Sequence, residues 1–148
     1  MLRFLLFLVL NFGALFIGSL LMGSPAENTW YQKLCRAPWT PPGWVFGAAW
    51  FTIMVLFAVY LSRVFKQVAD KRSFWLLAIA HYVLNVCWNP LFFQWHWVLP
   101  ALIVLIALFA VLLVYWIRYR QEAGWYRYLL VPYLLWLLIA CSLNAYVL

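Results

Sequence analysis

The stretch VLPALIVLIALFAVLLVYWI, residues 98–117, contains no charged residue and decides the fold class. A helix needs about 20 mostly apolar residues to cross the hydrocarbon core of a bilayer. Backbone polar groups in that core must pair within their own segment unless the segment belongs to a closed barrel, and this stretch lacks the alternation of a barrel strand. It is therefore predicted to be a membrane-spanning helix.

Four further segments have the same character, and they cover residues 4–22, 45–61, 74–95 and 129–148. The chain of 148 residues is 70% hydrophobic and 9% charged, whereas a soluble domain has about 25% charged residues. The first segment follows Arg3 as a signal peptide would, but its apolar stretch is longer than the roughly 7–15 residues of a signal core. The sequence predicts an all-α integral membrane protein, a bundle of five transmembrane helices in a single domain, 1–148.

The basic residues are distributed unevenly among the connections between these spans. Eight of the ten Lys and Arg lie before the first span or in the second and fourth connections: Arg3, Arg63, Lys66, Lys71, Arg72, Arg118, Arg120 and Arg127. Inner loops of bacterial-type membranes are enriched in Lys and Arg. The pattern predicts the N-terminus inside, with the first connection and the C-terminus outside. It also accounts for the net charge of +7 without a nucleic-acid partner.

The first connection is rich in Trp and Pro, with the sequence TWYQKLCRAPWTPPGW at residues 29–44. TWYQ fits a capping box in which Thr29 is the N-cap and Gln32 lies three residues later. This predicts a short helix from Trp30 to about Cys35.

The second half of the same connection is predicted to begin the second span, with Thr40 as its cap and Pro41 in its first turn. We expect a semi-rigid lid loop between the first two helices. For Trp39 and Trp44, an aromatic belt at the membrane interface is the alternative.

Polar and aromatic residues inside three spans recur at helical spacing. They are Phe46, Trp50, Met54 and Phe57 in the second span, His81, Asn85, Trp88, Asn89 and Phe92 in the third, and Tyr133, Trp136, Ala140 and Asn144 in the fifth. Polar faces of membrane helices turn into the bundle, because an unpaired polar group in lipid is costly. Three such faces predict an aromatic pocket with a few amides, which is the composition of a small-molecule site.

Helix packing is the alternative for the polar residues of these faces. Asn side chains hydrogen-bond between membrane helices without any ligand, and a packing role is the favoured interpretation of His81. Pro90 predicts a kink that widens one end of the bundle. The acids Glu27, Asp70 and Glu122 all lie in connections, and no Cys/His spacing suggests a metal site, so conventional catalysis is not indicated.

Three motifs, WYQKLCRAPWTPPGWVF at residues 30–46, NVCWNPLFF at 85–93 and VPYLLWLLIACSLN at 131–144, resemble the TspO/MBR family. This family is also called translocator protein or peripheral benzodiazepine receptor. The resemblance covers essentially the whole chain and implies a homodimer of five-helix bundles. It further implies a pocket on the side of the first long connection, for protoporphyrin IX and isoquinoline or benzodiazepine-type ligands. No cofactor is required. Matching positions place Tyr31, Trp50, Asn85, Trp88, Asn89, Trp136 and Ala140 in that pocket.

Together, the faces and the resemblance define a predicted ligand-binding set: Tyr31, Trp39, Phe46, Trp50, Met54, Asn85, Trp88, Asn89, Phe92, Trp136 and Ala140. Lys33 and Arg36 are further candidates, for ligand carboxylates. The family's association with tetrapyrrole transport, sensing and stress response supplies the first functional hypothesis. A light-dependent enzyme that degrades porphyrin through Trp50 and Trp136 is one alternative, and a structural or regulatory dimer is another. No Lys or Arg follows Arg127, so the cholesterol-recognition pattern of animal members is missing.

Overall fold

A computed structural model describes residues 1–148, and every regular element in it is helical. The elements are α1 (Leu2–Met22), α2 (Thr29–Lys33), α3 (Gly43–Gln67), α4 (Lys71–Phe93), α5 (Val98–Arg118), α6 (Arg120–Ala123), the 3-10 helix η1 (Gly124–Leu130) and α7 (Val131–Tyr146). Five helices are long and apolar enough to cross a membrane, the fifth being the stretch Arg120–Tyr146. The predicted five-helix membrane bundle is confirmed.

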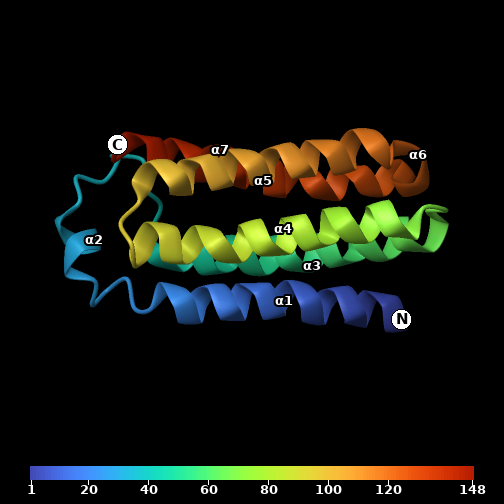
Figure 1. Cartoon of the computed structure of the whole chain (residues 1–148), viewed down its shortest axis with the longest axis horizontal. Helices are drawn as coiled ribbons and strands as arrows, with labels where there is room; N and C mark the ends of the chain where they lie inside the picture. Colours follow the sequence, from blue (N-terminus) through green and yellow to red (C-terminus); the bar gives the residue numbers. More distant parts are fainter.

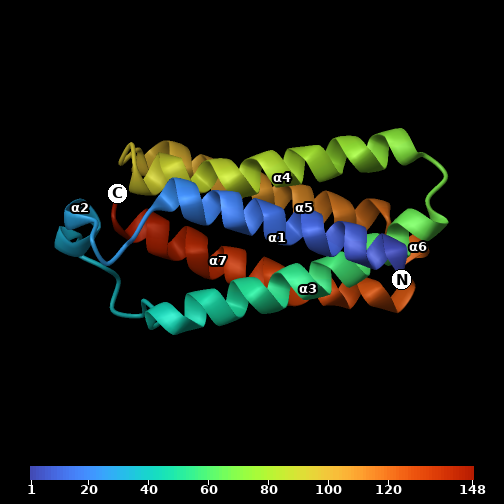
Figure 2. The same cartoon turned by 90° about the horizontal axis from the view of Figure 1, so that it is seen from below.

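The long helices lie side by side along one axis (Figures 1 and 2). α1 packs against α3 and α4, α4 against α5, and α5 against α7, while α3 contacts η1 and α7 and closes the ring. One end of the bundle carries the N-terminus, the α3–α4 connection and α6 (Figure 1). The other end carries α2, the α4–α5 connection and the C-terminus. The basic residues of the predicted inner side therefore gather at one end.

Aromatic rings fill the core in the half of the bundle nearer to the N-terminus. Phe7, Phe57, Phe74, Tyr60 and Tyr115 are all at most 1% exposed. Their rings meet edge to face, at 5.7 Å between Phe7 and Phe74 and 5.7 Å between Phe57 and Tyr115. Such pairs contribute about 0.5–1.5 kcal/mol each beyond area burial. This aromatic packing supports the opposite half of the bundle, which contains the two cavities of the candidate site.

The N-terminus of α2 differs from the predicted capping box. Asn28, not Thr29, is the cap, because its Oδ1 accepts a hydrogen bond from the Tyr31 N–H at 3.0 Å. Gln32 does not reach back to the cap and instead donates to the Pro25 carbonyl at 3.0 Å. α2 then ends at Lys33 rather than near Cys35. Asn is as good a cap as Ser or Asp, and a tertiary contact described below holds Asn28 in place.

The start of α3 also lies later than predicted. α3 begins at Gly43, and Thr40 turns back to donate its hydroxyl to the Ala37 carbonyl at 2.7 Å. The reason is the second proline: a residue that precedes proline avoids the helical region, so Pro41 cannot begin a helix before Pro42. Pro42 itself is extended, with φ −57° and ψ 149°.

The fifth span begins with a change of helix type. The 3-10 segment η1 comes first, so α7 starts at Val131 rather than at Leu129, with a proline in its first turn. In α4, helical structure continues past Pro90 to Phe93. His96, in the following connection, has a φ of 57°, which is uncommon for a residue other than glycine.

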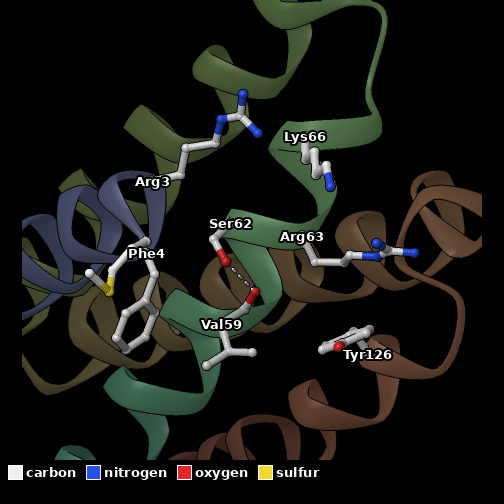
Figure 3. A pocket seen from close by; sticks show the side chains of 8 residues that line it. Arg3, Phe4, Val59, Ser62, Arg63, Lys66 and Tyr126 are labelled. Carbon is white, nitrogen blue, oxygen red and sulfur yellow. Dashed lines mark hydrogen bonds between the residues drawn. The ribbon is translucent and has the colours of Figure 1, made fainter.

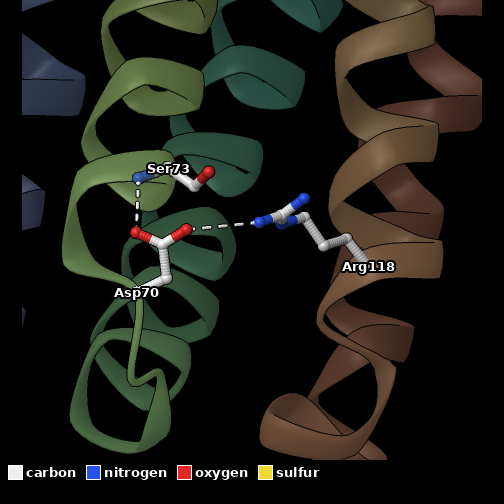
Figure 4. Close-up of polar contacts among 3 residues, drawn as sticks. All are labelled: Asp70, Ser73 and Arg118. Atoms are coloured by element: carbon white, nitrogen blue, oxygen red, sulfur yellow. Dashed lines mark hydrogen bonds and ion pairs between the residues drawn. The ribbon is translucent and has the colours of Figure 1, made fainter.

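At the end of the bundle near the N-terminus, Asp70 joins two helices (Figure 4). Its Oδ1 accepts from the Ser73 N–H at 3.0 Å and caps α4, and Arg118 at the end of α5 lies 3.4 Å from its Oδ2. The backbone hydrogen bond from Ser73, with Arg118 as a lesser contribution, holds the pKa of the Asp70 carboxyl below its usual value.

Candidate ligand-binding site

A cavity of about 400 Å³ lies between α1, α3, α4 and the segment that joins α1 to α3. This segment, which includes α2, is called the Trp/Pro connection below. Its volume lies in the range of about 300–1,000 Å³ that is typical of small-molecule sites. Six residues of the predicted ligand-binding set line it: Tyr31, Phe46, Trp50, Asn85, Trp88 and Asn89. The structure thus brings together side chains from the first connection and from two different spans.

A second, smaller cavity of about 60 Å³ lies next to the first and reaches α7. Six residues border both cavities: Tyr31, Arg36, Thr40, Phe46, Trp88 and Phe93. The smaller cavity adds Phe92 and Ala140 from the predicted set, together with Asn144. Because Phe46 and Trp88 border both spaces, a change in either rotamer alters the size of both.

Three predicted residues line neither cavity. Trp39 is 54% exposed and donates its Nε1–H to Ser142 Oγ at 3.2 Å. The Met54 side chain is fully buried, and its carbonyl accepts from Asn11 at 3.0 Å. Trp136 is buried in the core and meets Phe46 edge to face at 5.3 Å. Trp136 therefore supports a wall residue from behind.

The Tyr133 hydroxyl forms hydrogen bonds with two polar side chains of α4. Asn85 Nδ2 donates to the Tyr133 hydroxyl at 2.7 Å, and His81 Nε2 lies 2.9 Å from the same oxygen. Since that oxygen accepts from Asn85, its proton is free to be donated to His81. These bonds tie α4 to α7 and place His81 in helix packing. Asn89 is less constrained, because its Nδ2 has only a long 3.4 Å contact with the Asn85 carbonyl.

Two other polar side chains beside the cavities are buried without a hydrogen-bond partner. They are the indole Nε1 of Trp88 and both amide atoms of Asn144. More than about 90% of buried polar groups in proteins are hydrogen-bonded, so each exception needs an explanation. One N–H donor and one complete amide therefore lack a protein partner in side chains that line the cavities.

Glycines line or adjoin the larger cavity, and the sequence analysis did not identify them as site residues. Gly43 and Gly47 line it from α3, and a Cβ at either would meet no atom within 4 Å. On α1, a Cβ at Gly18 would lie 2.6 Å from Asn89 Nδ2, so only glycine lets Asn89 lie there. The contribution of α1, through Leu15, Ser19 and Met22, was also missed. A spacing of four between Gly43 and Gly47 was the available signal.

The Trp/Pro connection lies across one end of the bundle (Figure 2), and specific side-chain contacts hold it there. Asn28 Nδ2 donates to the Phe93 carbonyl at 2.9 Å. Tyr31 packs on Phe93 with ring centroids 5.2 Å apart, and Trp30 stacks on His96 at 4.2 Å. These contacts fix Tyr31 in the wall of both cavities.

The one charged residue that lines the two cavities belongs to the connection. Arg36 borders both cavities, and its guanidinium lies 5.6 Å from the centre of the Tyr31 ring. Neither cavity has an acidic residue in its walls. Lys33, the other predicted partner for carboxylates, lines neither of them.

Comparison with known proteins shows the family. The model of the TspO/MBR family matches residues 5–148. This chain belongs to the TspO/MBR family. Similar proteins include Protein CrtK of Rhodobacter capsulatus, 30% identical over 80% of this chain and 76% of that protein. Another is the tryptophan-rich sensory protein of Cereibacter sphaeroides, 31% identical over 79% of this chain and 73% of that protein.

The relationship extends to animals. The translocator protein of Homo sapiens is 30% identical to this TspO/MBR protein over 78% of this chain and 70% of the human one. The residues that carried the resemblance in the sequence, 30–46, 85–93 and 131–144, supply most of the walls of the two cavities. The family's motifs in this member thus converge on one end of the bundle.

Proposed function

We propose that this TspO/MBR protein binds a flat, mostly apolar aromatic ligand, such as the tetrapyrrole protoporphyrin IX, at the end of the bundle covered by the Trp/Pro connection. Relatives named tryptophan-rich sensory protein and translocator protein favour a role in sensing or moving such a ligand. Isoquinoline and benzodiazepine-type molecules fit the same description.

The observation that carries this proposal is the pair of unpartnered polar groups beside aromatic walls. Trp88 Nε1 and the Asn144 amide have no hydrogen-bond partner in side chains that line the cavities, and rotation of these side chains would allow them to pair with the ring nitrogens or carboxylates of a ligand. Trp50, Phe46 and Tyr31 supply aromatic surface, worth about 0.5–1.5 kcal/mol per ring contact beyond burial.

Arg36 is placed to bind the carboxylates at the polar edge of the same ligand. Arg36 offers a planar set of donors that matches a carboxylate, and it borders both cavities. A macrocycle needs more room than the larger cavity alone, and rotation of Phe46 or Trp88 would join the two spaces. In this proposal, the connection acts as the lid that excludes water.

Titration in the dark tests the binding. Protoporphyrin IX is added to detergent-purified protein, and its Soret band is followed. We expect saturable binding that weakens about 3- to 10-fold in Trp88→Phe, which removes one hydrogen-bond donor. The matched control is Trp97→Phe, because Trp97 is 56% exposed and lines neither cavity. Saturable binding that neither variant alters would place the ligand elsewhere.

Illumination of the complex tests the enzymatic alternative, which is favoured by the position of Trp50 on the cavity wall. Light-dependent loss of porphyrin absorbance, with formation of a defined product, would indicate degradation. We expect Trp50→Phe to slow that loss while binding in the dark persists. Equal bleaching of free and bound porphyrin would exclude this activity.

A further inference from the structure

A second concave site lies at the opposite end of the bundle from the two cavities. It is a groove of about 460 Å³ between the start of α1, the last turns of α3 and η1 (Figure 3). Its walls include Arg3, Phe4, Val59, Ser62, Arg63, Lys66 and Tyr126. Three cationic side chains and no acidic one border it, so the groove is positively charged.

The positive charges of the groove are not neutralised by the protein. The one ion pair in the structure joins Arg118 and Asp70. The Arg63 guanidinium lies 5.5 Å from the centre of the Tyr126 ring, and its buried Nε has no hydrogen-bond partner. Arg3 and Lys66 are exposed. The guanidinium of Arg63 is therefore oriented by a ring and has donors available.

Two other basic residues at this end of the bundle, Lys71 and Arg127, are engaged with the protein. Lys71 Nζ donates to the carbonyls of Val68, at 2.7 Å, and of Phe65, which are C-terminal carbonyls of α3. Arg127 donates to the Tyr128 hydroxyl at 3.1 Å and lies over two rings. Arg72 and Arg120 are exposed but do not line the groove. The groove is therefore the place at this end where three cations without an acidic partner, Arg3, Arg63 and Lys66, border one concave surface.

The groove also has an apolar side. Phe4, Val59 and the ring of Tyr126 contribute to its walls (Figure 3). It lies at the ends of the spans α1 and α3, where long basic side chains extend from a membrane toward the headgroup layer. Ser62 adds no donor, because its hydroxyl is donated to the Val59 carbonyl at 2.8 Å.

We infer that this groove binds a phosphate-bearing anion at the edge of the membrane. Arg matches phosphate oxygens with parallel donors, and Lys adds a point charge. The phosphate group can belong to an anionic lipid headgroup or to a soluble phosphate ester, since both present the same chemistry to Arg3, Arg63 and Lys66. The inference is independent of the ligand proposed at the other end.

Native mass spectrometry of the detergent-purified protein tests the inference. Phosphatidylglycerol is added as the anionic probe, and phosphatidylcholine as the probe with no net charge. We expect bound phosphatidylglycerol to be retained preferentially and to fall about fivefold for each cation removed, in Lys66→Gln and in Arg63→Gln. Arg72→Gln is the matched control, because Arg72 is exposed near the same end but does not line the groove.

Glycerol 1-phosphate distinguishes the two sources of phosphate. If it displaces the lipid at comparable concentration, the groove recognises the phosphate ester alone; if it does not, the lipid chains contribute and the ligand is a lipid. Either outcome supports the inference when Lys66→Gln weakens binding and Arg72→Gln does not. Equal losses in both variants, or no preference for phosphatidylglycerol, would overturn it. Arg3→Gln, at an exposed position, replaces Arg63→Gln if that variant fails to fold.

Discussion

At the scale of single residues, the candidate site depends on which polar atoms are already paired. Asn85 and His81 both bond to the Tyr133 hydroxyl, and this junction holds α4 against α7. Asn89, one turn further along α4, has only a 3.4 Å contact and can respond to its surroundings. Asn85 and Asn89 lie on the same face of α4 but have different roles. Asn85 joins two helices because Tyr133 of α7 lies within hydrogen-bond distance, whereas Asn89 has no such partner.

Gly18→Ala tests the importance of the space beside Asn89. The new Cβ would lie 2.6 Å from Asn89 Nδ2, so the amide must rotate away from α1. We expect affinity for protoporphyrin IX to fall about 3- to 10-fold, the equivalent of one hydrogen bond, as measured by dark titration of the Soret band. Gly13→Ala on the same helix is the control, since its Cβ would meet Tyr82 at an ordinary 3.7 Å. Equal affinities in the two variants would contradict the prediction.

At the scale of elements, the short helix α2 is held in place by one side chain that acts twice. The oxygen of the Asn28 amide caps α2, while its nitrogen donates to the carbonyl of Phe93 at the end of α4. A helix of this length is not stable by itself. Its order therefore derives from these bonds and from the packing of Trp30 and Tyr31 on the bundle.

Asn28→Ala removes both contacts of that amide. We expect a local loss of about 1–2 kcal/mol, seen as faster amide hydrogen exchange in residues 29–36 with little change in the long helices. Asn28→Asp separates the two roles, because aspartate keeps the capping oxygen and lacks the donor to Phe93. If exchange of the connection is unchanged in Asn28→Ala, the aromatic contacts alone hold α2.

Asp70 gives the start of α4 a dependence on pH. Its pKa is lowered in the folded protein by the Ser73 N–H and by Arg118, so the ionised form stabilises the fold. That stability is present above the unfolded pKa of about 4 and is lost as pH falls through the folded pKa. We expect unfolding measurements to show a difference between the wild type and Asp70→Ala at neutral pH that shrinks in acid. Asp70→Asn, which keeps a capping oxygen, should lose less; a difference that grows in acid would contradict this assignment.

At the scale of the whole molecule, the basic residues are concentrated at one end of the bundle. The structure places the N-terminus, the α3–α4 connection and α6 at one end and the Trp/Pro connection at the other (Figure 1). Eight of the ten Lys and Arg lie at or near the first of these ends, in the connections or in the helix turns next to them. The positive-inside rule then predicts that the ligand cavities open to the outside and that the groove at Arg63 faces inside.

Cys35 offers a direct test of this orientation. It is exposed in the Trp/Pro connection, whereas Cys87 and Cys141 are half-buried within spans. A membrane-impermeant maleimide added to intact cells is expected to label Cys35. A Lys66→Cys, Cys35→Ser variant, with its thiol at the opposite end, should be labelled only after lysis. The reverse pattern would invert the predicted topology.

The sequence by itself determined the class of fold, the number of spans and the members of the polar faces. Those properties depend on composition and on helical periodicity, which act within each segment: a chain with 9% charged residues and five long apolar stretches has no other stable arrangement in a bilayer. The choice of Phe46, Trp50, Trp88 and Asn89 as pocket residues rested on the same periodicity and on the resemblance to TspO/MBR proteins, and the structure places all four at one cavity.

Only the tertiary structure decided which of these side chains face open space. Trp136 and Met54 share a face with cavity residues, yet they pack behind the walls because neighbouring helices cover them. Gly43 and Gly47 line the cavity, and Gly18 leaves the space that Asn89 occupies. A glycine in the sequence does not indicate which side chain of another helix lies against it, so only the structure pairs Gly18 with Asn89. The cap at Asn28 depends on a contact 65 residues distant in the chain. The start of α3 at Gly43, directly after its cap Pro42, depends on the second of two prolines, so local motifs predicted both positions incorrectly.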